Sequence, residues 1–441
     1  MISSGFLYVK HASATARGVV SRQAFGLQSR AFSRSSYLRQ IEDIACLKDR
    51  VSPSYEESKT SDLLALKWPT PPENILLVRK RGAPAVTESL TQFANHIKST
   101  YSPISVILER EAATDIHDSL PFPVYTNLSS DKIPVEKIDL IVTLGGDGTI
   151  LRASSFFATS KVVPPVLSFS MGTLGFLGEW EFSEYKSAFR EVYMSGSEHA
   201  ESNASETPSN SLATPTGWDA VRGKSMGASR SARILMRSRL RVGLFTPDGQ
   251  PVHNKDGAAL SSPTAGDDGV HAMNEVVIHR GKQPHLAVVQ VFVGNRFLTE
   301  AVADGIIVST PTGSTAYSLS CGGSIIHPLV PSLLLTPICP RSLSFRPLVI
   351  PSSTPVTLRL SEKNRGSEVE VSIDGVVVDQ GLSVGMEVRV WGEQIKTDKG
   401  DWIGGIPCVM RKMSGEGVAA DGWVGGLNGL LKFNYPFGSD P

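Results

Sequence analysis

The sequence has few cysteines and no excess of charge of either sign. Its four cysteines are widely spaced and form no Cys-x-x-Cys pair, which argues against a disulfide framework and against a zinc site. Its 43 basic and 43 acidic side chains cancel, so no net charge attracts the chain to nucleic acid or to an anionic membrane. No apolar run is long enough to span a bilayer. We therefore expect neither nucleic acid nor a membrane as a partner, and a 441-residue chain of two domains with additional segments.

The first 41 residues contain no Asp or Glu, and Glu42 is the first acidic residue of the chain. The same stretch holds six Lys and Arg side chains and many Ser and Ala. This composition is typical of a mitochondrial transit peptide, and Arg30–Ser33 is similar to a matrix-processing site. The sequence thus predicts a transit peptide over residues 1–41 and a location in the mitochondrial matrix. A disordered basic tail is the alternative.

The segment after Ile138–Leu144 is the most informative part of the sequence. The apolar run favours a strand buried on both faces, and Gly145, Gly146 and Gly148 allow the backbone to approach a ligand closely. Amide groups in such a loop bind anions, above all phosphate. A carboxylate at Asp147 would repel phosphate unless it binds a metal or accepts a proton from a hydroxyl. The loop therefore indicates phosphoryl transfer to an alcohol, with a strand-to-helix turn and a solvated aspartate as the bland alternative.

Alternating strand and helix patterns precede and follow this loop, and they predict a parallel α/β sheet whose ligand site lies at the carboxyl ends of its strands. From residue 273 onward, short β-rich runs separated by turn residues predict a mainly antiparallel β-sandwich. Residues 195–230 are rich in Ser, Thr, Gly and Pro, which is typical of a disordered insertion. The expected organisation is a transit peptide at 1–41, a linker at 42–73, an α/β domain at 74–194, the insertion at 195–230, a β-sandwich domain at 231–400 and a tail at 401–441.

Two further motifs carry polar groups suited to a nucleotide. Strand Ile306–Val308 leads into a loop with five hydroxyl side chains, and Tyr317 ends the motif with a ring that can stack on a heterocycle. The alternative is a Ser/Thr turn network that only holds its own backbone. Asn274 and Glu275 open another short strand, where they form a turn or face a ligand at the domain junction.

In this order, these motifs resemble the NAD kinase family. The resemblance covers about residues 74–395, apart from the insertion, and is nearest to fungal mitochondrial members that prefer NADH. It rests on the segments Gly145–Thr149, Leu174–Leu177, Asn274–Val277, Asp304–Tyr317 and Thr336–Pro347.

The resemblance implies an enzyme that uses ATP with Mg²⁺ to phosphorylate the 2′-hydroxyl of the adenosine ribose of NADH or NAD⁺. It also implies a nucleotide site between an α/β and a β-sandwich domain, and a homo-oligomer. Asp147 would activate the hydroxyl, while the glycine loop with Thr149 would hold the ATP phosphates. No protein side chains are assigned as a dedicated metal site. The residues that the resemblance places at NAD(H) are Phe176, Asn274, Glu275, Asp304, Thr312, Thr315, Ala316, Tyr317 and Ser320.

Two other functions share parts of this pattern. Lipid kinases contain a Gly-Gly-Asp-Gly-Thr loop, but they lack the segment that runs from Thr310 to Tyr317. A non-enzymatic NAD-binding sensor would keep the hydroxyl-rich loop without needing Asp147. The sequence leaves open the choice between NADH and NAD⁺, and between ATP and polyphosphate as the donor.

Overall fold

The computed structural model describes residues 41–58, 61–101, 103–130, 132–172, 175–178, 180–196, 231–252, 269–397 and 399–411, together with Trp423, Leu427 and Leu431. These residues all fall within one compact unit of the chain. The predicted transit peptide, except Ile41, and the predicted insertion, except Ser195 and Gly196, lie outside the described residues.

The first sheet contains eleven described strands, and its centre is parallel. Its strand order is β1-β6-β5-β4-β7-β8-β24-β10-β3-β2, and β9 pairs with β8. The five residues of β7 and the six of β4 are all buried, as expected for strands covered on both faces. The strands are β1 (Ile41–Asp43), β2 (Ser54–Glu57), β3 (Leu64–Lys67), β4 (Asn74–Arg79), β5 (Ser105–Leu108), β6 (Val124–Thr126), β7 (Leu140–Leu144), β8 (Val166–Ser170), β9 (Trp180–Glu181), β10 (Arg233–Arg237) and β24 (Ile406–Met410).

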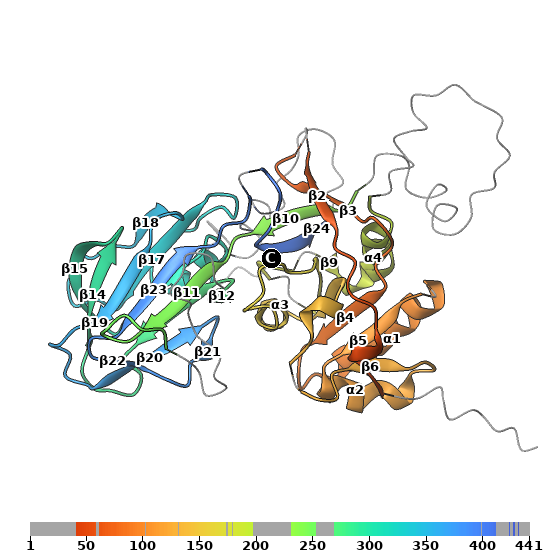
Figure 1. Cartoon of the computed structure of the whole chain (residues 1–441), viewed down its shortest axis with the longest axis horizontal. Coiled ribbons are helices and arrows are strands. Elements are labelled where there is room, and N and C mark those ends of the chain that lie inside the picture. The colour runs from red at the N-terminus through yellow and green to blue at the C-terminus, as the bar shows by residue number, and fades with distance from the viewer. Residues whose placement is uncertain are drawn as a thin grey trace, which may run out of the picture. The chain divides into compact units, whose positions relative to one another are not determined.

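Helices cover both faces of this sheet (Figure 1). On one face, Leu90 and Phe93 of the first helix pack in a core cluster that also contains Leu77. On the other face, Ile150 packs in a cluster with Leu76, because successive strand residues point to opposite sides. The helices are α1 (Pro84–Thr100), α2 (Arg110–Ile116), α3 (Asp147–Ser155) and α4 (Tyr185–Tyr193), with 3₁₀ turns η2 (Ile44–Cys46), η3 (His117–Ser119), η4 (Val135–Lys137) and η5 (Phe182–Glu184).

The first sheet recruits strands from segments that the sequence pattern assigned elsewhere. Residues 42–73, expected to be a linker, include β2 and β3, while β10 lies in the range expected for the β-sandwich and β24 in the expected tail. β24 pairs with β8 in parallel and with β10 in antiparallel register. These pairings join segments more than 150 residues apart, which local patterns do not reveal.

The remaining strands form two antiparallel sheets, so the predicted α/β-plus-all-β fold class is confirmed. The six-stranded sheet has the order β12-β11-β23-β19-β14-β15, and the seven-stranded sheet has the order β18-β17-β16-β13-β20-β21 with β22 beside β20. The six strands are β11 (Leu240–Phe245), β12 (Val270–Ala272), β14 (Ala287–Val293), β15 (Arg296–Ala303), β19 (Val356–Leu360) and β23 (Glu387–Gly392). The seven are β13 (Glu275–His279), β16 (Gly305–Ser309), β17 (Ser332–Ile338), β18 (Leu348–Pro351), β20 (Glu368–Ile373), β21 (Val376–Val377) and β22 (Leu382–Ser383).

The two antiparallel sheets share one apolar core. Val242 of β11 and Val276 of β13 belong to the same buried cluster, as do Leu358 of β19 and Val371 of β20. A single core built from side chains of two facing sheets is typical of a β-sandwich. η6 (Thr312–Thr315) and the short helix α7 (Tyr317–Ser320) follow β16. Cys321 at the end of α7 packs against a small cluster that includes Val277 and Ile338.

A buried ion pair joins the first sheet to the sandwich. Arg239 lies between β10 and β11, and its guanidinium contacts the carboxylate of Glu393 at 2.5 and 2.8 Å. The same guanidinium donates to the carbonyls of Phe157, Ser160 and Lys161, just beyond α3. No helix in the described part of the chain has the length and apolar character needed to cross a membrane.

Candidate active site

The glycine loop joins β7 to α3 at the carboxyl edge of the first sheet. The N–H of Gly145 donates to the carbonyl of Phe169, which ties the loop to β8. A Cβ at Gly145 would lie 2.2 Å from Thr149 Oγ1, so only glycine allows the first turn of α3 to fold back so closely. A Cβ at Gly146 or Gly148 would meet no described atom within 4 Å. The loop is therefore tight against its own helix and open on its other side.

Asp147 is the first residue of α3, and its carboxylate is held by the backbone of a neighbouring segment. The N–H groups of Phe176 and Leu177 donate to its two oxygens at 2.9 and 3.1 Å. Asp147 is half-buried, so the carboxylate is neither lost in the core nor free in bulk solvent. Each carboxylate oxygen keeps acceptor capacity for a further donor. The structure thus fixes Asp147 and Phe176 together, beside the glycine loop.

Asn274 and Glu275 are positioned by Asp374, which lies in the turn between β20 and β21. Asp374 has a φ of 48°, and its carboxylate accepts N–H bonds from Met273, Asn274 and Glu275 at 2.7, 2.7 and 3.1 Å. Its own N–H donates to the carbonyl of Glu275. No local sequence pattern reveals this role, because Asp374 and Asn274 lie 100 residues apart.

The hydroxyl-rich loop packs directly on Asn274. The Thr310 N–H donates to the Asn274 carbonyl at 2.8 Å, and a Cβ at Gly313 would lie 2.2 Å from the same oxygen. Thr315 Oγ1 donates to the Thr312 carbonyl, and Ser314 Oγ to that of Pro311. Part of this loop therefore forms a turn network of its own, while its backbone places Thr312 beside Asn274.

Several buried polar atoms at this junction have no hydrogen-bond partner among the described residues. They are Asn274 Oδ1, Glu275 Oε2, Ser309 Oγ and Arg237 Nε. Buried polar groups are nearly always satisfied, and an exception calls for an explanation such as a bound ligand. Burial raises the pKa of Glu275 to about 8, with the negative charge of Asp374 as the second cause. A neutral carboxyl group there can donate a hydrogen bond as well as accept one.

Arg237, which the sequence reasoning did not select, contacts the same loop. Its guanidinium is 2% exposed, and Nη1 lies 3.4 Å from Thr312 Oγ1. The only sequence signal was its place at one end of a short strand that has an arginine at each end and apolar residues between them. Burying a cation is costly unless it is paired, and Arg237 Nε has no hydrogen-bond partner among the described residues.

Asp304 and Tyr317 lie farther along the sheet from Asn274. Asn274 lies at the end of the β13–β16 pair where Glu275 is opposite Ser309, whereas Asp304 precedes Gly305 at the other end. Asp304 pairs with Arg280 at 2.5 Å, and its N–H donates to the carbonyl of Ile338. Tyr317 begins α7 and is exposed. Burial of its hydroxyl end raises the pKa of Tyr317, and the charges of Cys321, Cys339 and Asp304 contribute further. Ala316 precedes Tyr317, and the exposed Ser320 ends the helix.

The predicted residues thus form two groups, one around Asp147 and one that extends along β16 from Asn274 to Asp304 at its other end. Met273, next to Asn274, belongs to the same core cluster as Ile150 of α3 and Leu177, so shared packing connects the two groups. Three or more His, Cys, Asp or Glu side chains placed to hold a metal do not occur among the residues that the structure describes.

Comparison with known proteins identifies the family. Residues 76–197 match the ATP-NAD kinase N-terminal domain, and residues 273–395 match the ATP-NAD kinase C-terminal domain. The chain is 38% identical over 411 residues to the mitochondrial NADH kinase pos5 of Schizosaccharomyces pombe, covering 91% of this chain and 88% of that protein. The chain belongs to the NAD kinase family.

Two further similarities agree with this family. The mitochondrial NADH kinase POS5 of Saccharomyces cerevisiae is 34% identical, over 90% of this chain and 89% of that protein. The crystal structure of yeast NADH kinase complexed with NADH superposes with a TM-score of 0.71 at 34% identity, covering 92% of this chain and 99% of that one. The predicted resemblance is confirmed, and the chain is an NAD(H) kinase-type phosphotransferase, for which ATP and NAD(H) are the family's substrates. A lipid kinase and a non-enzymatic sensor are not favoured.

Proposed function

We propose that this kinase transfers the terminal phosphoryl group of ATP to the 2′-hydroxyl of the adenosine ribose of NADH or NAD⁺, giving NADPH or NADP⁺ in the mitochondrial matrix. The carboxylate of Asp147, fixed by the N–H groups of Phe176 and Leu177 beside the open glycine loop, is the observation that carries this proposal. The names of the two mitochondrial NADH kinases support the substrate and the compartment.

Asp147 acts as the general base in this reaction. It accepts the proton of the 2′-hydroxyl as that oxygen attacks the terminal phosphorus of ATP, and ADP leaves with the electron pair of the broken P–O bond. Gly145, Gly146, Gly148 and Thr149 surround the donor phosphates at the start of α3. The N–H groups of Gly145 and Thr149 donate to the carbonyls of Phe169 and Gly146, so the N–H groups of Gly146 and Gly148 are the ones that bind the phosphates. General-base assistance of this kind contributes about 10²–10⁴-fold to the rate.

The group that extends from Asn274 to Asp304, together with Phe176 beside Asp147, holds the dinucleotide. Phe176 lines the adenosine pocket, and the unpartnered oxygens of Asn274 and Glu275 bond to the adenosine half. Thr312, Thr315, Ala316, Tyr317 and Ser320 lie along the remainder, with Asp304 and Ala316 toward the nicotinamide.

Mg²⁺ accompanies ATP in this proposal. Mg²⁺ is usually held by substrate phosphates and one or two carboxylates rather than by a cage of protein ligands. The described residues fit that mode, because the carboxylate of Asp147 lies beside the glycine loop where the phosphates would be held. When bound, the ion neutralises charge on the phosphates as they transfer.

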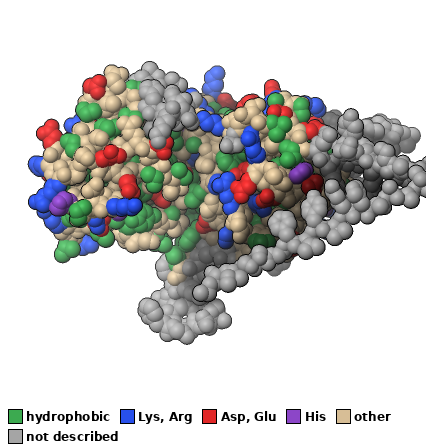
Figure 2. All heavy atoms as spheres, turned by 90° about the horizontal axis from the view of Figure 1, so that it is seen from below, with side chains coloured by type: hydrophobic (Ala, Val, Ile, Leu, Met, Phe, Trp, Pro, Cys, Tyr) green, Lys and Arg blue, Asp and Glu red, His purple; other side chains and the backbone are tan. Residues whose placement is uncertain are grey.

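An exposed apolar surface supports the proposal of a homo-oligomer. Phe297 and Leu298 of β15 and Val349 of β18 are exposed, as is Leu343 in the loop before β18. β15 and β18 are edge strands of the two sandwich sheets, and a groove between them is lined by Leu298 and Phe345. Exposed apolar side chains gathered at one place mark interaction surfaces. Figure 2 shows acidic and basic side chains interspersed over the face in view.

Product formation tests the proposed reaction. Purified protein with ATP and Mg²⁺ should convert NADH or NAD⁺ to a 2′-phosphorylated product, measured with an NADP-specific dehydrogenase. Asp147→Asn should lower kcat by about 10²–10⁴-fold and leave NADH binding, measured by fluorescence titration, nearly unchanged. No phosphorylated product from either dinucleotide would refute the reaction, whereas full activity of Asp147→Asn would refute only the base assignment.

Import into isolated mitochondria tests the compartment. The full chain should reach the matrix and become protected from external protease, whereas a chain without residues 1–41 should stay outside. Matrix arrival of the shortened chain would overturn the targeting role of that segment.

A further inference from the structure

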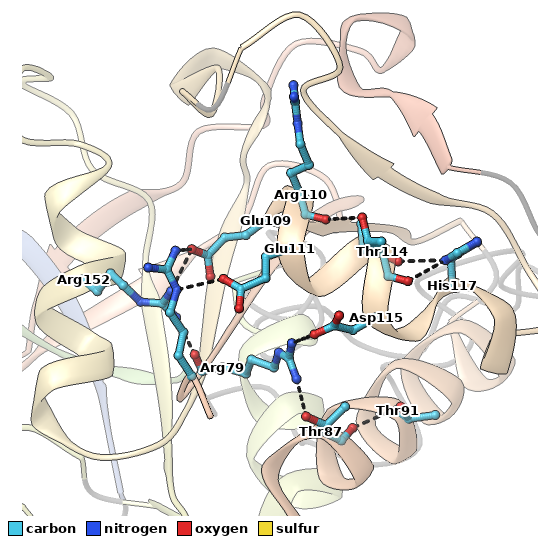
Figure 3. A network of polar contacts seen from close by, with 12 residues as sticks. Arg79, Thr87, Thr91, Glu109, Arg110, Glu111, Thr114, Asp115, His117 and Arg152 are labelled. Atoms are coloured by element: carbon cyan, nitrogen blue, oxygen red, sulfur yellow. Dashed lines mark hydrogen bonds and ion pairs between the residues drawn. The ribbon is translucent and has the colours of Figure 1, made fainter. Parts of the chain in front are cut away.

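Three cations in sequence, Arg79, Lys80 and Arg81, lie at the end of β4 next to the glycine loop. Arg79 is engaged within the protein. Its guanidinium pairs with Asp115 and bonds to Thr87 (Figure 3). It is also buried, so its role is to hold α1 and α2 at this edge of the sheet.

The neighbouring arginines are compensated in the same way. Arg152 of α3 contacts Glu109 at 2.8 Å and donates to the carbonyl of Arg79 (Figure 3). Arg81 contacts Glu109 at 3.3 Å and Glu111 at 3.2 Å. The positive charge of these side chains is therefore largely cancelled by carboxylates of the protein.

Lys80 differs from all three. It is exposed and has no carboxylate within ion-pair distance among the described residues. Its N–H donates to the carbonyl of Leu144 at 2.8 Å, and a Cβ at Gly145 would lie 3.2 Å from Lys80 Cβ. The side chain of Lys80 therefore starts directly against the glycine loop and carries the uncompensated positive charge there.

We propose that Lys80 binds the phosphate groups of the phosphoryl donor, which rests on the proposed role of the glycine loop. The phosphate groups of ATP would meet the negative charge of Asp147 at this loop, and a nearby cation offsets that repulsion. An ammonium on a flexible stem is a common phosphate ligand. The three compensated arginines build the frame around Lys80, and the lysine is the exposed cation beside the loop that no described carboxylate compensates.

Direct binding of an ATP analogue tests this assignment without relying on turnover. The Kd of the imido analogue of ATP with Mg²⁺ is measured by titration calorimetry for wild type, Lys80→Gln and Lys80→Arg. Lys48→Gln is the matched control, because Lys48 is an exposed lysine near the opposite end of β4, where the Asn74 side chain donates to its carbonyl. NADH affinity of each variant is measured by fluorescence.

Lys80→Gln should weaken binding of the analogue by about tenfold or more, as expected for loss of a charge-assisted contact, and raise the KM for ATP similarly. NADH affinity should change by less than about twofold, Lys80→Arg should keep most of the donor affinity, and Lys48→Gln should match wild type. Added salt should weaken analogue binding more steeply in wild type than in Lys80→Gln, because a charge contact is screened.

Unchanged analogue affinity in Lys80→Gln overturns the assignment, and so does an equal loss of NADH affinity, which would indicate a general distortion of the loop. If wild type forms no phosphorylated dinucleotide but Lys80→Gln still loses analogue affinity, the proposed reaction fails while the phosphate contact stands. Wild-type turnover with unaffected Lys80→Gln binding gives the opposite result, so the two failures are distinguishable.

Discussion

Gly175 lies so close to Asp147 that a Cβ at Gly175 would be 2.1 Å from Asp147 Oδ1 and 2.6 Å from its Cγ. The absence of a side chain at Gly175 is what lets the next two N–H groups reach the carboxylate. The orientation of the proposed base, Asp147, thus depends on Gly175, which lies more than twenty residues after Asp147 in the chain.

Gly175→Ala should therefore displace the Asp147 carboxylate and lower kcat by at least about tenfold, approaching the loss expected for Asp147→Asn. The φ of Gly175 is not in the left-handed region, so alanine adds no backbone strain there and its main effect is the clash with the Asp147 carboxylate. Gly178→Ala is the matched control, since a Cβ there would make only an ordinary contact with Ile150 at 3.8 Å. Equal kcat values for the two alanine variants would contradict this view of Gly175.

Asp374→Asn should destabilise the protein and weaken NADH binding. The backbone N–H groups of Met273, Asn274 and Glu275 now donate to the Asp374 carboxylate. In asparagine one carboxylate oxygen is replaced by an NH₂ group, which cannot accept these bonds, and the N–H groups left unsatisfied should cost about 1–3 kcal/mol. Urea unfolding and NADH titration measure the two effects. Asp118→Asn, at a position whose side chain is 80% exposed, should change neither. An Asp374→Asn protein with wild-type stability and affinity would remove the positioning role.

Glu275 should make the stability of the ligand-free protein depend on pH. Its pKa rises from an ordinary 4.5 to about 8 in the folded state, through burial first and the charge of Asp374 second. The unfolded chain therefore ionises Glu275 at a lower pH than the folded protein does. Ionisation of Glu275 therefore favours the unfolded chain and lowers the free energy of unfolding as pH rises. This loss of stability is absent below about pH 4.5, grows by up to about 1.4 kcal/mol per pH unit as pH rises toward 8, and is constant above that.

Glu275→Gln should flatten this part of the profile, because the amide does not titrate. Urea unfolding at several pH values between 5 and 8 provides the measurement. Parallel profiles for wild type and Glu275→Gln would show that Glu275 is ionised in both states and would contradict the raised pKa.

The Arg239–Glu393 pair should contribute strongly to the joint between the first sheet and the sandwich. Both side chains are nearly inaccessible, at 2% and 6%, so Arg239→Met leaves a buried carboxylate without its partner and should cost about 3–5 kcal/mol. Replacing both residues by methionine removes the uncompensated charge and should recover much of that loss. The double variant being less stable than Arg239→Met would exclude this explanation, as judged by chemical unfolding.

The apolar surface on β15 and β18 should govern self-association. Leu343 is 85% exposed, so Leu343→Glu should leave the fold intact while placing a charge in a subunit interface. Sedimentation velocity should then show a smaller species than wild type at the same concentration. Val376→Glu, at another exposed apolar position on β21, is the control and should sediment as wild type. Identical profiles for Leu343→Glu and wild type would place any interface elsewhere.

Local patterns predicted much of the secondary structure, because strand and helix periodicities are set by neighbours in the chain. Strand patterns at Ser105–Leu108 and Val356–Leu360 match the bounds of β5 and β19, and the patterns at Asn74–Val78 and Ile138–Leu144 differ from β4 and β7 by one or two residues. The apolar residues at helical spacing predict a helix over Thr87–Thr100, whereas α1 begins earlier, at Pro84, since proline suits the first turn of a helix. The sequence pattern did not predict β17. One reason is that Pro337 lies within it, and proline in a strand pattern argues against that assignment.

The site divides along the same physical line. The sequence by itself determined the glycine loop, the aspartate that follows it, the Asn-Glu pair and the hydroxyl-rich segment, because backbone freedom and side-chain chemistry are properties of the residues themselves. Only the tertiary structure decided that Gly175 makes room for Asp147, that Asp374 holds Asn274, and that Arg237 lies against Thr312. These contacts join residues that are far apart in the chain, and only packing and hydrogen bonding in the folded protein select which distant partners meet.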